Sequence, residues 1–376
     1  MGTGQCALGA IRSIKDDKNI KIIVIGNEKK GLAQYSRYVD TFYPCNENDI
    51  NNIYSVLDEI NKQYDKIILI PTGSDFWVNI IIKAPGNFDN FITDIDPQYS
   101  KLMEKSYQQK LAEECGVPYP ESYKICNNED LNNACRVLHF PCVVKPVSRV
   151  VKELPFRIRS YKTPENLIKD IVPFLGQCDF LASTQIVGED KRLYTYGSLA
   201  VGGNVTVEYS GRKLTQRPMQ FGVAGIAESI ALIEEIQHYS KELLKKANFS
   251  GISQIEFKQD KHDGKYYLME INPRIWLWAQ IATESGVNLP LAYYYYLSNL
   301  GTVKYVQNNK KVMFISGLSL FDNTFREKNF TWIKYYFKSR FVKHIYGIKS
   351  LKDMEPYRVE RKRFLKKIIH KTKNNM

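Results

Sequence analysis

The chain has 376 residues, of which 44% are apolar, which is enough for two or three domains with cores of their own. No apolar run is long enough to cross a membrane as a helix, and no signal peptide is visible. The formal charge of +13 favours anionic partners such as nucleotides, acidic substrates, phospholipid surfaces or nucleic acid. The seven cysteines are scattered without a C-x-x-C pair, which predicts a reduced cytoplasmic protein.

The N-terminal part of the chain alternates between predicted strands and helices. Residues 21–26 (KIIVIG) and 66–71 (KIILIP) are apolar runs typical of buried strands, and residues 50–64 have a helical pattern. This alternation predicts a small parallel α/β domain. A glycine-rich turn at residues 2–4 opens a helix at the start of the chain, whereas such a turn is expected after a strand. We therefore expect the first strand of this domain to be missing, and we interpret the glycines as a tight turn.

A helix and a charged strand follow. Residues 101–115 predict a helix, which Gly116 ends as a C-cap, with Pro118 beyond it. Residues 140–146 (FPCVVKP) predict a strand with one charged residue, Lys145. We expect this lysine to point inward, where its charge costs free energy unless an anion such as a phosphate pairs with it.

The middle of the chain predicts mainly antiparallel structure. Residues 180–190 (FLASTQIVGED) predict a strand that ends in a turn, and residues 191–211 predict a hairpin around two glycines. Residues 212–230 predict a glycine-containing loop with a basic face, and residues 233–248 predict an amphipathic helix. These elements lead to the segment on which the functional prediction depends.

That segment is a predicted β-hairpin with acids on both strands. Residues 260–265 (DKHDGK) contain Asp-Gly, a strong turn signal between two β-prone runs. Glu256 lies on the first strand, and Glu270 and Asn272 lie two residues apart on the second, so the latter two share one face. Three hard oxygen donors on one face suit Mg²⁺ between nucleotide phosphates. The alternative is a surface hairpin whose acids face water.

Glu256, followed after a turn by E-I-N-P-R at residues 270–274, resembles the metal-binding signature of the ATP-grasp superfamily. Members include D-alanine–D-alanine ligase, biotin carboxylase and carbamoyl phosphate synthetase. Residues 104–120 (EKSYQQKLAEECGVPYP), the V-x-K-P strand and the helix-glycine-helix layout of residues 275–300 resemble the same family. The resemblance covers roughly residues 20 to 300. It implies an α/β fold of the ATP-grasp type with a preceding parallel α/β domain.

The resemblance implies four parts of the chain: 1–98, the α/β domain; 99–182, the first ATP-grasp lobe; 183–325, the second lobe with the metal site; and 326–376, a basic C-terminal extension. It also implies metal ligands for two Mg²⁺ ions, with Mn²⁺ as an alternative, that bridge the ATP phosphates: Glu256, Glu270 and Asn272. Two lysines would bind phosphate: Lys105 and Lys145. Solvated surface is the alternative for Lys105.

The remaining implied contacts concern adenosine and the reacting groups. Backbone groups of Ser183 and Ile186 would pair with the adenine edge, and Asp190 would bind the ribose hydroxyls. Arg274 would lie near the transferred phosphate or the substrate carboxylate. An arginine that reaches the phosphate is also expected, for which Arg217 is the first candidate.

Arg212 is the second candidate for this arginine, and a surface arginine is the alternative. Two departures from the family pattern stand out. Thr184 replaces a common glutamate, and residues 147–160 (VSRVVKELPFRIRS) contain no glycine where the family has a glycine-rich flap. Charge could replace the missing glycines through four basic residues: Arg149, Lys152, Arg157 and Arg159.

We therefore expect a ligase in which ATP phosphorylates a carboxylate and an amine attacks the acyl phosphate, giving an amide, ADP and phosphate. The same residues could serve carbamate or carboxylation chemistry. A nucleotide-binding protein without turnover is one rival, and a nucleic-acid-binding protein is another, although no recognised module supports the latter. Small-molecule acids and amines are the expected partners, and a homodimer is left open.

The C-terminal segment is strongly basic. From Arg361 onward there are seven Lys or Arg residues and no acid, while Phe364, Leu365, Ile368 and Ile369 share one face of a predicted helix. Such a helix could lie on an anionic membrane and place the protein peripherally at the inner membrane face. The alternative, which we favour slightly, packs the apolar face on the protein itself.

Overall fold

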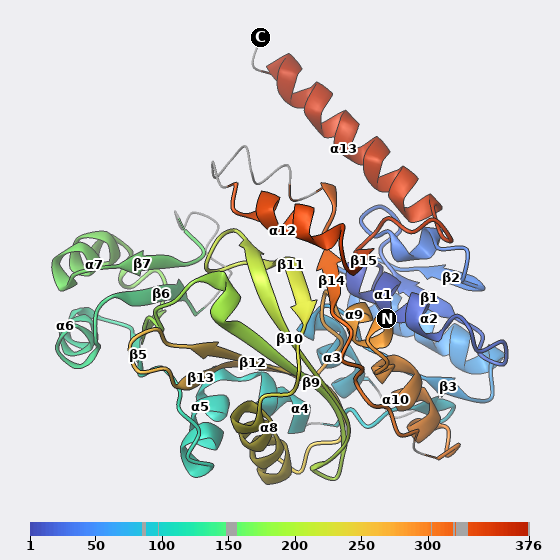
Figure 1. Cartoon of the computed structure of the whole chain (residues 1–376), viewed down its shortest axis with the longest axis horizontal. Helices are drawn as coiled ribbons and strands as arrows, with labels where there is room; N and C mark the ends of the chain where they lie inside the picture. Colours follow the sequence, from blue (N-terminus) through green and yellow to red (C-terminus); the bar gives the residue numbers. More distant parts are fainter. Residues whose placement is uncertain are drawn as a thin grey trace.

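The structure is a computed structural model that describes residues 1–84, 88–96, 98–147, 156–301, 303–318, 320 and 330–374. Within them, an N-terminal α/β domain lies on one side of a large sheet, and a smaller four-stranded sheet with its helices lies on the other (Figure 1). No helix of this described part is long and apolar enough to span a bilayer.

The N-terminal domain contains two pairs of parallel strands, β1 with β2 and β3 with β4. Its first element is α1, and the residues before it lie between the pairs: the Gly2 amide donates to the Ile25 carbonyl (2.9 Å) and the N-terminal amine to the Ile70 carbonyl (2.7 Å). Asp49 caps α2 and Ser74 caps α3 with side-chain oxygens. The elements are α1 (Gln5–Ile14), β1 (Ile23–Gly26), η1 (Ala33–Tyr35), β2 (Thr41–Pro44), α2 (Ile50–Gln63), β3 (Ile67–Ile68), α3 (Asp75–Ile82) and β4 (Phe91–Ile92).

Two helices connect this domain to the smaller sheet. The predicted helix 101–115 is interrupted at Glu104, which gives α4 (Gln98–Met103) and α5 (Lys105–Glu114). Gly116 follows α5 with φ +63°, as expected for a helix-ending glycine. Leu111 and Ala112 of α5 are buried in the same cluster as the large sheet's Tyr196 and Phe257, so α5 packs on that sheet.

The four-stranded sheet has the order β5-β8-β6-β7, and α6 and α7 cover one of its faces (Figure 1). Cys142 and Val144 of β6 are buried against these helices, together with Phe180 of β8. Because strand residues alternate between faces, Val143 and Lys145 lie on the opposite face. The elements are β5 (Ser122–Ile125), α6 (Asn128–Val137), β6 (Cys142–Pro146), β7 (Arg159–Tyr161), α7 (Pro164–Ile171), η2 (Val172–Phe174) and β8 (Phe180–Thr184).

The large sheet, over the described residues, has the order β13-β12-β9-β10-β11-β14-β15. The predicted loop at 212–230 is wrong: β10 continues to Arg217 and pairs with β9 and β11. Trp276 and Trp278, 2% and 1% exposed, belong to the core. The elements are η3 (Asp190–Arg192), β9 (Leu193–Val201), β10 (Asn204–Arg217), β11 (Val223–Ser229), α8 (Glu234–Lys246), β12 (Gly251–Gln259), β13 (Tyr266–Asn272), α9 (Gln280–Glu284), α10 (Leu289–Leu297) and β14 (Val312–Ile315).

The C-terminal part begins in the large sheet and then leaves it. β15 (Lys343–Tyr346) pairs in parallel with β14, after α12 (Trp332–Ser339). The chain then crosses to the N-terminal domain and ends in α13 (Glu355–Asn374), which projects from the body (Figure 1). The four predicted domain limits remain a prediction, but β15 ties residues beyond 326 to the second lobe.

Candidate active site

The predicted acid-bearing hairpin is present. β12 and β13 are antiparallel, and their register places Glu256 directly opposite Glu270 and Gln254 opposite Asn272. The register shifts just after Glu256, so Met269 is the extra residue of a β-bulge. Two like charges directly opposite on paired strands destabilise a sheet unless a cation compensates. The geometry therefore favours a cation site over a hairpin whose acids only face water.

Glu256 already has one cation, which sequence reasoning missed. Lys213 Nζ on β10 lies 2.8 Å from Glu256 Oε1, and the two side chains are only 8% and 11% exposed. Glu270, by contrast, is exposed and has no ion-pair partner among the residues that the structure describes. The positive charge of Lys213 thus offsets one of the two opposed acids, and Glu270 faces the open side of the site.

Hydrogen bonds extend from this pair across the site to the N-terminal domain. Gln254 Nε2 donates to Glu256 Oε1 (2.9 Å), and Asn272 Nδ2 donates to Gln254 Oε1 (3.5 Å). Arg274 donates from its NH2 group to Asn272 Oδ1 (3.0 Å) and from Nε to Asp75 Oδ1 (2.7 Å). Asp75 is the first residue of α3 and lies 199 residues before Arg274 in the sequence. Arg274 is therefore positioned by a residue of the N-terminal domain.

These residues fit a Mg²⁺ ion that is also bound by phosphate. The described residues contain no group of three or more His, Cys, Asp or Glu side chains able to hold a metal, so these residues form no closed metal cage. Glu256, Glu270 and Asn272 supply two carboxylates and one amide oxygen, and Mg²⁺ commonly completes such sets with phosphate and water. Asn272 Oδ1 accepts one hydrogen bond from Arg274, and its second lone pair is left for a metal.

Lys105 lies beside the hairpin, as the resemblance implies. Its ammonium donates to the carbonyl of Met269, the bulge residue. Burial lowers the pKa of Lys105 to about 8; the charge of Glu270 opposes this shift and the charge of Lys145 adds to it. Both charges act on Lys105 strongly enough to move its pKa, so these three side chains converge on one site.

Lys145 does not point inward, and that expectation is wrong. The side chain is exposed, because it alternates with Cys142 and Val144, which contact the helices. It occupies the uncovered face of the four-stranded sheet, which also carries Leu181, its neighbour in register on β8. The lysine therefore does not need a phosphate to offset burial, but it is free to reach one.

We expect Lys145→Met to keep the fold and to lose nucleotide binding. The methionine retains most of the apolar stem, and the lysine's exposure means that the apparent melting temperature without nucleotide stays within about 1 °C of wild type. The thermal shift on adding Mg-ATP should fall to less than a third of the wild-type value. Lys110→Met, an exposed lysine on α5, serves as the control. An undiminished shift in Lys145→Met would exclude a phosphate contact.

The lowered pKa of Lys105 predicts a pH dependence of nucleotide binding. Lys105 is charged below its pKa of about 8 and becomes neutral as the pH rises through that value. ATP affinity should therefore fall as the pH rises from 7 to 9.5, by roughly tenfold if one ammonium-phosphate contact is lost. Lys105→Arg, which stays charged, should remove the fall. Calorimetric titrations of both proteins across this range test the prediction, and parallel profiles would contradict it.

The predicted adenine-binding segment is present, with one correction. Ser183 lies within β8 between β5 and β6, so the strand ladders engage its backbone N–H and C=O, and its hydroxyl contacts that of Ser122 (2.7 Å). Ile186 lies just beyond the strand, is buried, and makes no backbone hydrogen bond with the described residues. Backbone contacts to a base are thus available at Ile186 and not at Ser183.

Asp190 and the candidate arginines have partners of their own. Asp190 accepts from the amide and the side chain of Gln216 (2.7 and 2.9 Å) and so holds the end of β10. Arg212 donates twice to Glu228, at 2.8 and 2.7 Å. Arg217 lies near Glu360 of α13; burial raises the pKa of Glu360 to about 7, and the charge of Arg217 opposes that shift. Among the described residues, the charged contacts of these two arginines are to Glu228 and Glu360 and not to the acid-bearing hairpin.

The glycine-free flap lies mostly outside the described residues, which include neither Arg149 nor Lys152. Of the other two basic residues in this segment, Arg159 forms an ion pair with Asp170 (2.5 Å) and its guanidinium lies over the ring of Phe156. Arg159 is thereby held on the outer part of the small sheet. The prediction that charge replaces the flap glycines stays a prediction for the other three.

Comparison with known proteins supports the fold. No protein-family model matches the chain. A curated relative, the C-terminal section of the carbamoyl phosphate synthase large chain from Methanopyrus kandleri, is 20% identical over 293 residues, which are 76% of this chain and 53% of that protein. The chain thus spans about half the length of this relative.

Three solved structures share most of the architecture. For the N5-carboxyaminoimidazole synthetase from Staphylococcus aureus, complexed with ADP, the TM-score is 0.64 and the identity is 14%. The match covers 87% of this chain and 84% of that protein. For biotin carboxylase from Campylobacter jejuni the TM-score is 0.63 and the identity is 17%, and the match covers 82% of this chain and 73% of that protein. For the L-amino acid ligase from Bacillus licheniformis the TM-score is 0.58 and the identity is 16%, and the match covers 80% of this chain and 73% of that protein.

The chain has the ATP-grasp fold that these similar solved structures share. Along the chain, the parallel strand pairs of the N-terminal part come first, then the four-stranded sheet, and then the large sheet with the acid-bearing hairpin. The expected ATP-grasp fold is therefore confirmed. The assignment of the hairpin to the second lobe as a metal site stays a prediction.

Proposed function

We propose that this protein is an ATP- and Mg²⁺-dependent ligase that activates a carboxylate as an acyl phosphate and joins it to an amine, releasing ADP and phosphate. One observation carries the proposal: Glu256 and Glu270 are opposed in register, and Lys105 and Lys145 converge on the side where Glu270 is unpaired. The similar solved structures include an L-amino acid ligase and ADP-bound synthetases, which supports the same class of chemistry.

The proposed chemistry needs positioning and charge, not a side-chain nucleophile. Mg²⁺ held by Glu256, Glu270 and Asn272 would supply charge neutralisation between the phosphates. The phosphoryl group passes from ATP to a carboxylate oxygen, and the amine nitrogen then attacks the acyl carbon. Phosphate leaves, and the nitrogen loses a proton. Lys105 and Lys145 hold phosphate oxygens in line for the transfer.

Arg274 is the proposed cation for the acid substrate. Its guanidinium is held between Asp75 of the N-terminal domain and Asn272 of the hairpin, so it lies where the two domains meet. An anionic substrate there can replace Asp75 as its partner while the phosphate is transferred. Arg217, which lies beside Glu360, has no role in this mechanism.

Carboxylation is the second candidate, because the relatives include carboxyaminoimidazole synthetases, a biotin carboxylase and a carbamoyl phosphate synthase section. In this case bicarbonate would replace the organic acid, and the same lysines and metal ligands would serve. A protein that binds ATP without turnover would retain the thermal shift with Mg-ATP and release no ADP.

ADP release separates these candidates. The full-length protein is assayed with Mg-ATP against panels of carboxylates and amines, each with and without bicarbonate. Release that needs one acid and one amine together, but no bicarbonate, supports the proposed ligase. Release that needs bicarbonate and a single amine favours carboxylation. Thermal stabilisation by Mg-ATP without release under any combination would exclude turnover on these substrates.

We expect the protein to work in a reducing compartment, the cytoplasm. All seven cysteines are free thiols, and three of them, Cys45, Cys142 and Cys178, are buried. Burial raises the pKa of Cys142 to about 12, which keeps this thiol protonated and unreactive. A homodimer stays a prediction that gel filtration with light scattering can test.

A further inference from the structure

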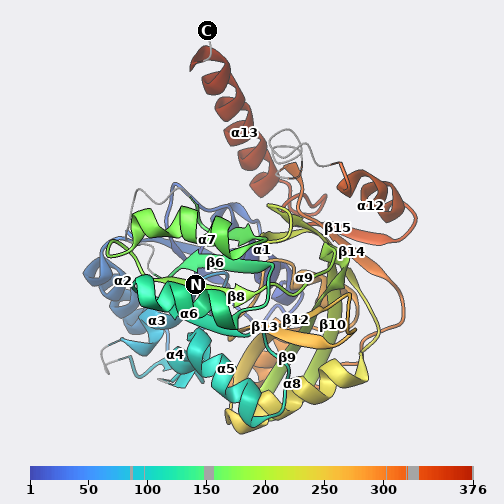
Figure 2. The ribbon, with the colours of Figure 1, turned by 90° about the vertical axis from the view of Figure 1, so that its left-hand side faces the viewer.

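The C-terminal helix is only partly packed on the protein. Figure 1 and Figure 2, seen from directions 90° apart, both show α13 leaving the body, with the C-terminus at its far end. Leu365 is 48% exposed and Ile369 is 57% exposed. The expectation that the apolar face of this segment packs on the protein is therefore wrong for Leu365 and Ile369.

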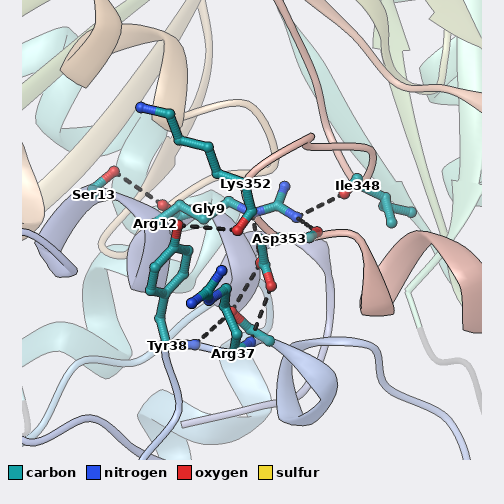
Figure 3. A network of polar contacts seen from close by, with 9 residues as sticks. Gly9, Arg12, Ser13, Arg37, Tyr38, Ile348, Lys352 and Asp353 are labelled. Atoms are coloured by element: carbon teal, nitrogen blue, oxygen red, sulfur yellow. Dashed lines mark hydrogen bonds and ion pairs between the residues drawn. The ribbon is translucent and has the colours of Figure 1, made fainter.

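The base of α13 is held firmly by a buried ion pair in the segment just before it. Arg12 of α1 donates from Nε to Asp353 Oδ2 (3.0 Å) and from NH2 to the Ile348 carbonyl (2.7 Å) (Figure 3). Asp353 also accepts from the Ser36 hydroxyl (2.9 Å) and the Arg37 amide (3.0 Å). Because Asp353 is 1% exposed and fully paired, this network fixes the starting point of the helix on the N-terminal domain.

Contacts along the helix include those of Arg363. Its NH1 group donates to the Gly31 carbonyl (2.7 Å), and its guanidinium lies over the Tyr35 ring. Glu360, one turn earlier, lies near Arg217 of the second lobe. The helix continues to Asn374, so its outer half extends from a base that is attached to two parts of the protein.

The outer half combines apolar side chains, of which Leu365 and Ile369 are exposed, with basic side chains. At 100° per residue, Phe364, Leu365 and Ile369 fall within about 140° of the helix circumference. Lys362 and Lys366 are exposed and lie next to this stripe on the helical wheel. From residue 361 to residue 374 the sequence has no acid, so the outer half of the helix has no negative side chain of its own.

We propose that the outer half of α13 binds an anionic lipid surface. The apolar stripe suits the boundary between headgroups and acyl chains, and the flanking lysines suit acidic headgroups. A second copy of the helix fits less well, because pairing would bring two acid-free basic segments together. Nucleic acid would engage the basic residues but would leave Leu365 and Ile369 in water.

The binding is expected to be reversible and sensitive to salt. So short an apolar stripe gives weak insertion by itself, and salt screens the attraction of the lysines to the headgroups. Because the base is rigid, lipid binding would also hold the N-terminal domain at a fixed orientation to the membrane. The proposed active site would then work beside the membrane surface.

Vesicle sedimentation of the full-length protein tests this proposal. Vesicles of phosphatidylcholine alone are compared with vesicles that contain one third phosphatidylglycerol, at 50 mM and 500 mM salt. We expect the protein to pellet with the anionic vesicles at low salt only. The double variant Leu365→Gln/Ile369→Gln and the double variant Lys362→Gln/Lys366→Gln should each reduce the bound fraction at least tenfold. These substitutions avoid Arg363, whose removal by truncation would disturb the base of the helix.

Matched controls are an exposed leucine and an exposed lysine elsewhere, Leu300→Gln and Lys62→Gln, which should bind like wild type. Unchanged melting temperatures show that the variants fold. Wild-type protein that stays in the supernatant with anionic vesicles overturns the proposal, as does undiminished binding by both double variants. If the wild-type protein binds no lipid but forms a dimer that the apolar double variant loses, the stripe binds a second copy of the chain instead. If the wild-type protein binds no lipid but binds RNA, and the apolar double variant still binds RNA, the helix binds nucleic acid instead.

Discussion

Glu270→Gln should abolish turnover and leave the fold intact. The substitution removes one anionic oxygen ligand from a site that must hold a doubly charged ion between phosphates, which costs about 3 kcal/mol or more of transition-state stabilisation, roughly a 100-fold loss of rate. The folded protein should be as stable as wild type or slightly more stable, because Glu270 is exposed and its charge opposes that of Glu256.

ADP release under saturating Mg-ATP measures the loss, and thermal unfolding without nucleotide measures the fold. Glu113→Gln, an exposed acid on α5, is the matched control and should keep both wild-type values. Full turnover by Glu270→Gln would mean that the opposed acids do not bind the catalytic metal. The ADP-releasing chemistry would then have to be assigned to another site.

Lys213→Met should be the most destabilising single change in the site. It leaves the Glu256 carboxylate, only 11% exposed, without its cation, and breaking a buried ion pair in this way typically costs about 3–5 kcal/mol. Two rescues distinguish this cause from poor packing. Glu256→Gln in the same chain removes the unpaired charge, and Mg-ATP supplies another cation beside it.

Urea unfolding of the single and double variants measures these effects. The double variant should recover more than half of the lost stability, because the two residues act as one unit. Lys110→Met removes an exposed lysine 3.9 Å from Glu114 and should change stability by less than about 0.5 kcal/mol. A loss below about 1 kcal/mol in Lys213→Met, or a double variant no more stable than the single one, would show that the pair contributes little.

Local patterns in the sequence were sufficient for the elements that carry the site. The Asp-Gly turn and the flanking β-prone runs predict a hairpin, and spacing within one strand places Glu270 and Asn272 on one face. Gly116 also ends its helix as the sequence predicts. All of these depend on residues close in sequence, where backbone geometry decides the outcome.

Contacts between residues that are distant in sequence depend on the tertiary fold. Lys213 reaches Glu256 only because β9 and β10 bring it across the sheet, and its segment has the glycines that favoured a loop. Asp75 reaches Arg274 from another domain. No local pattern encodes either contact.

The sequence by itself determined the ATP-grasp fold, the acid-bearing hairpin and the basic, partly apolar C-terminal helix. The tertiary structure decided which charges have partners: Lys145 is exposed, Arg212 is bound to Glu228, and α13 extends away from the body. The physical reason is that hydrogen bonding and side-chain alternation act over a few residues. Burial and ion pairing instead depend on which surfaces meet, and only the packed chain fixes that.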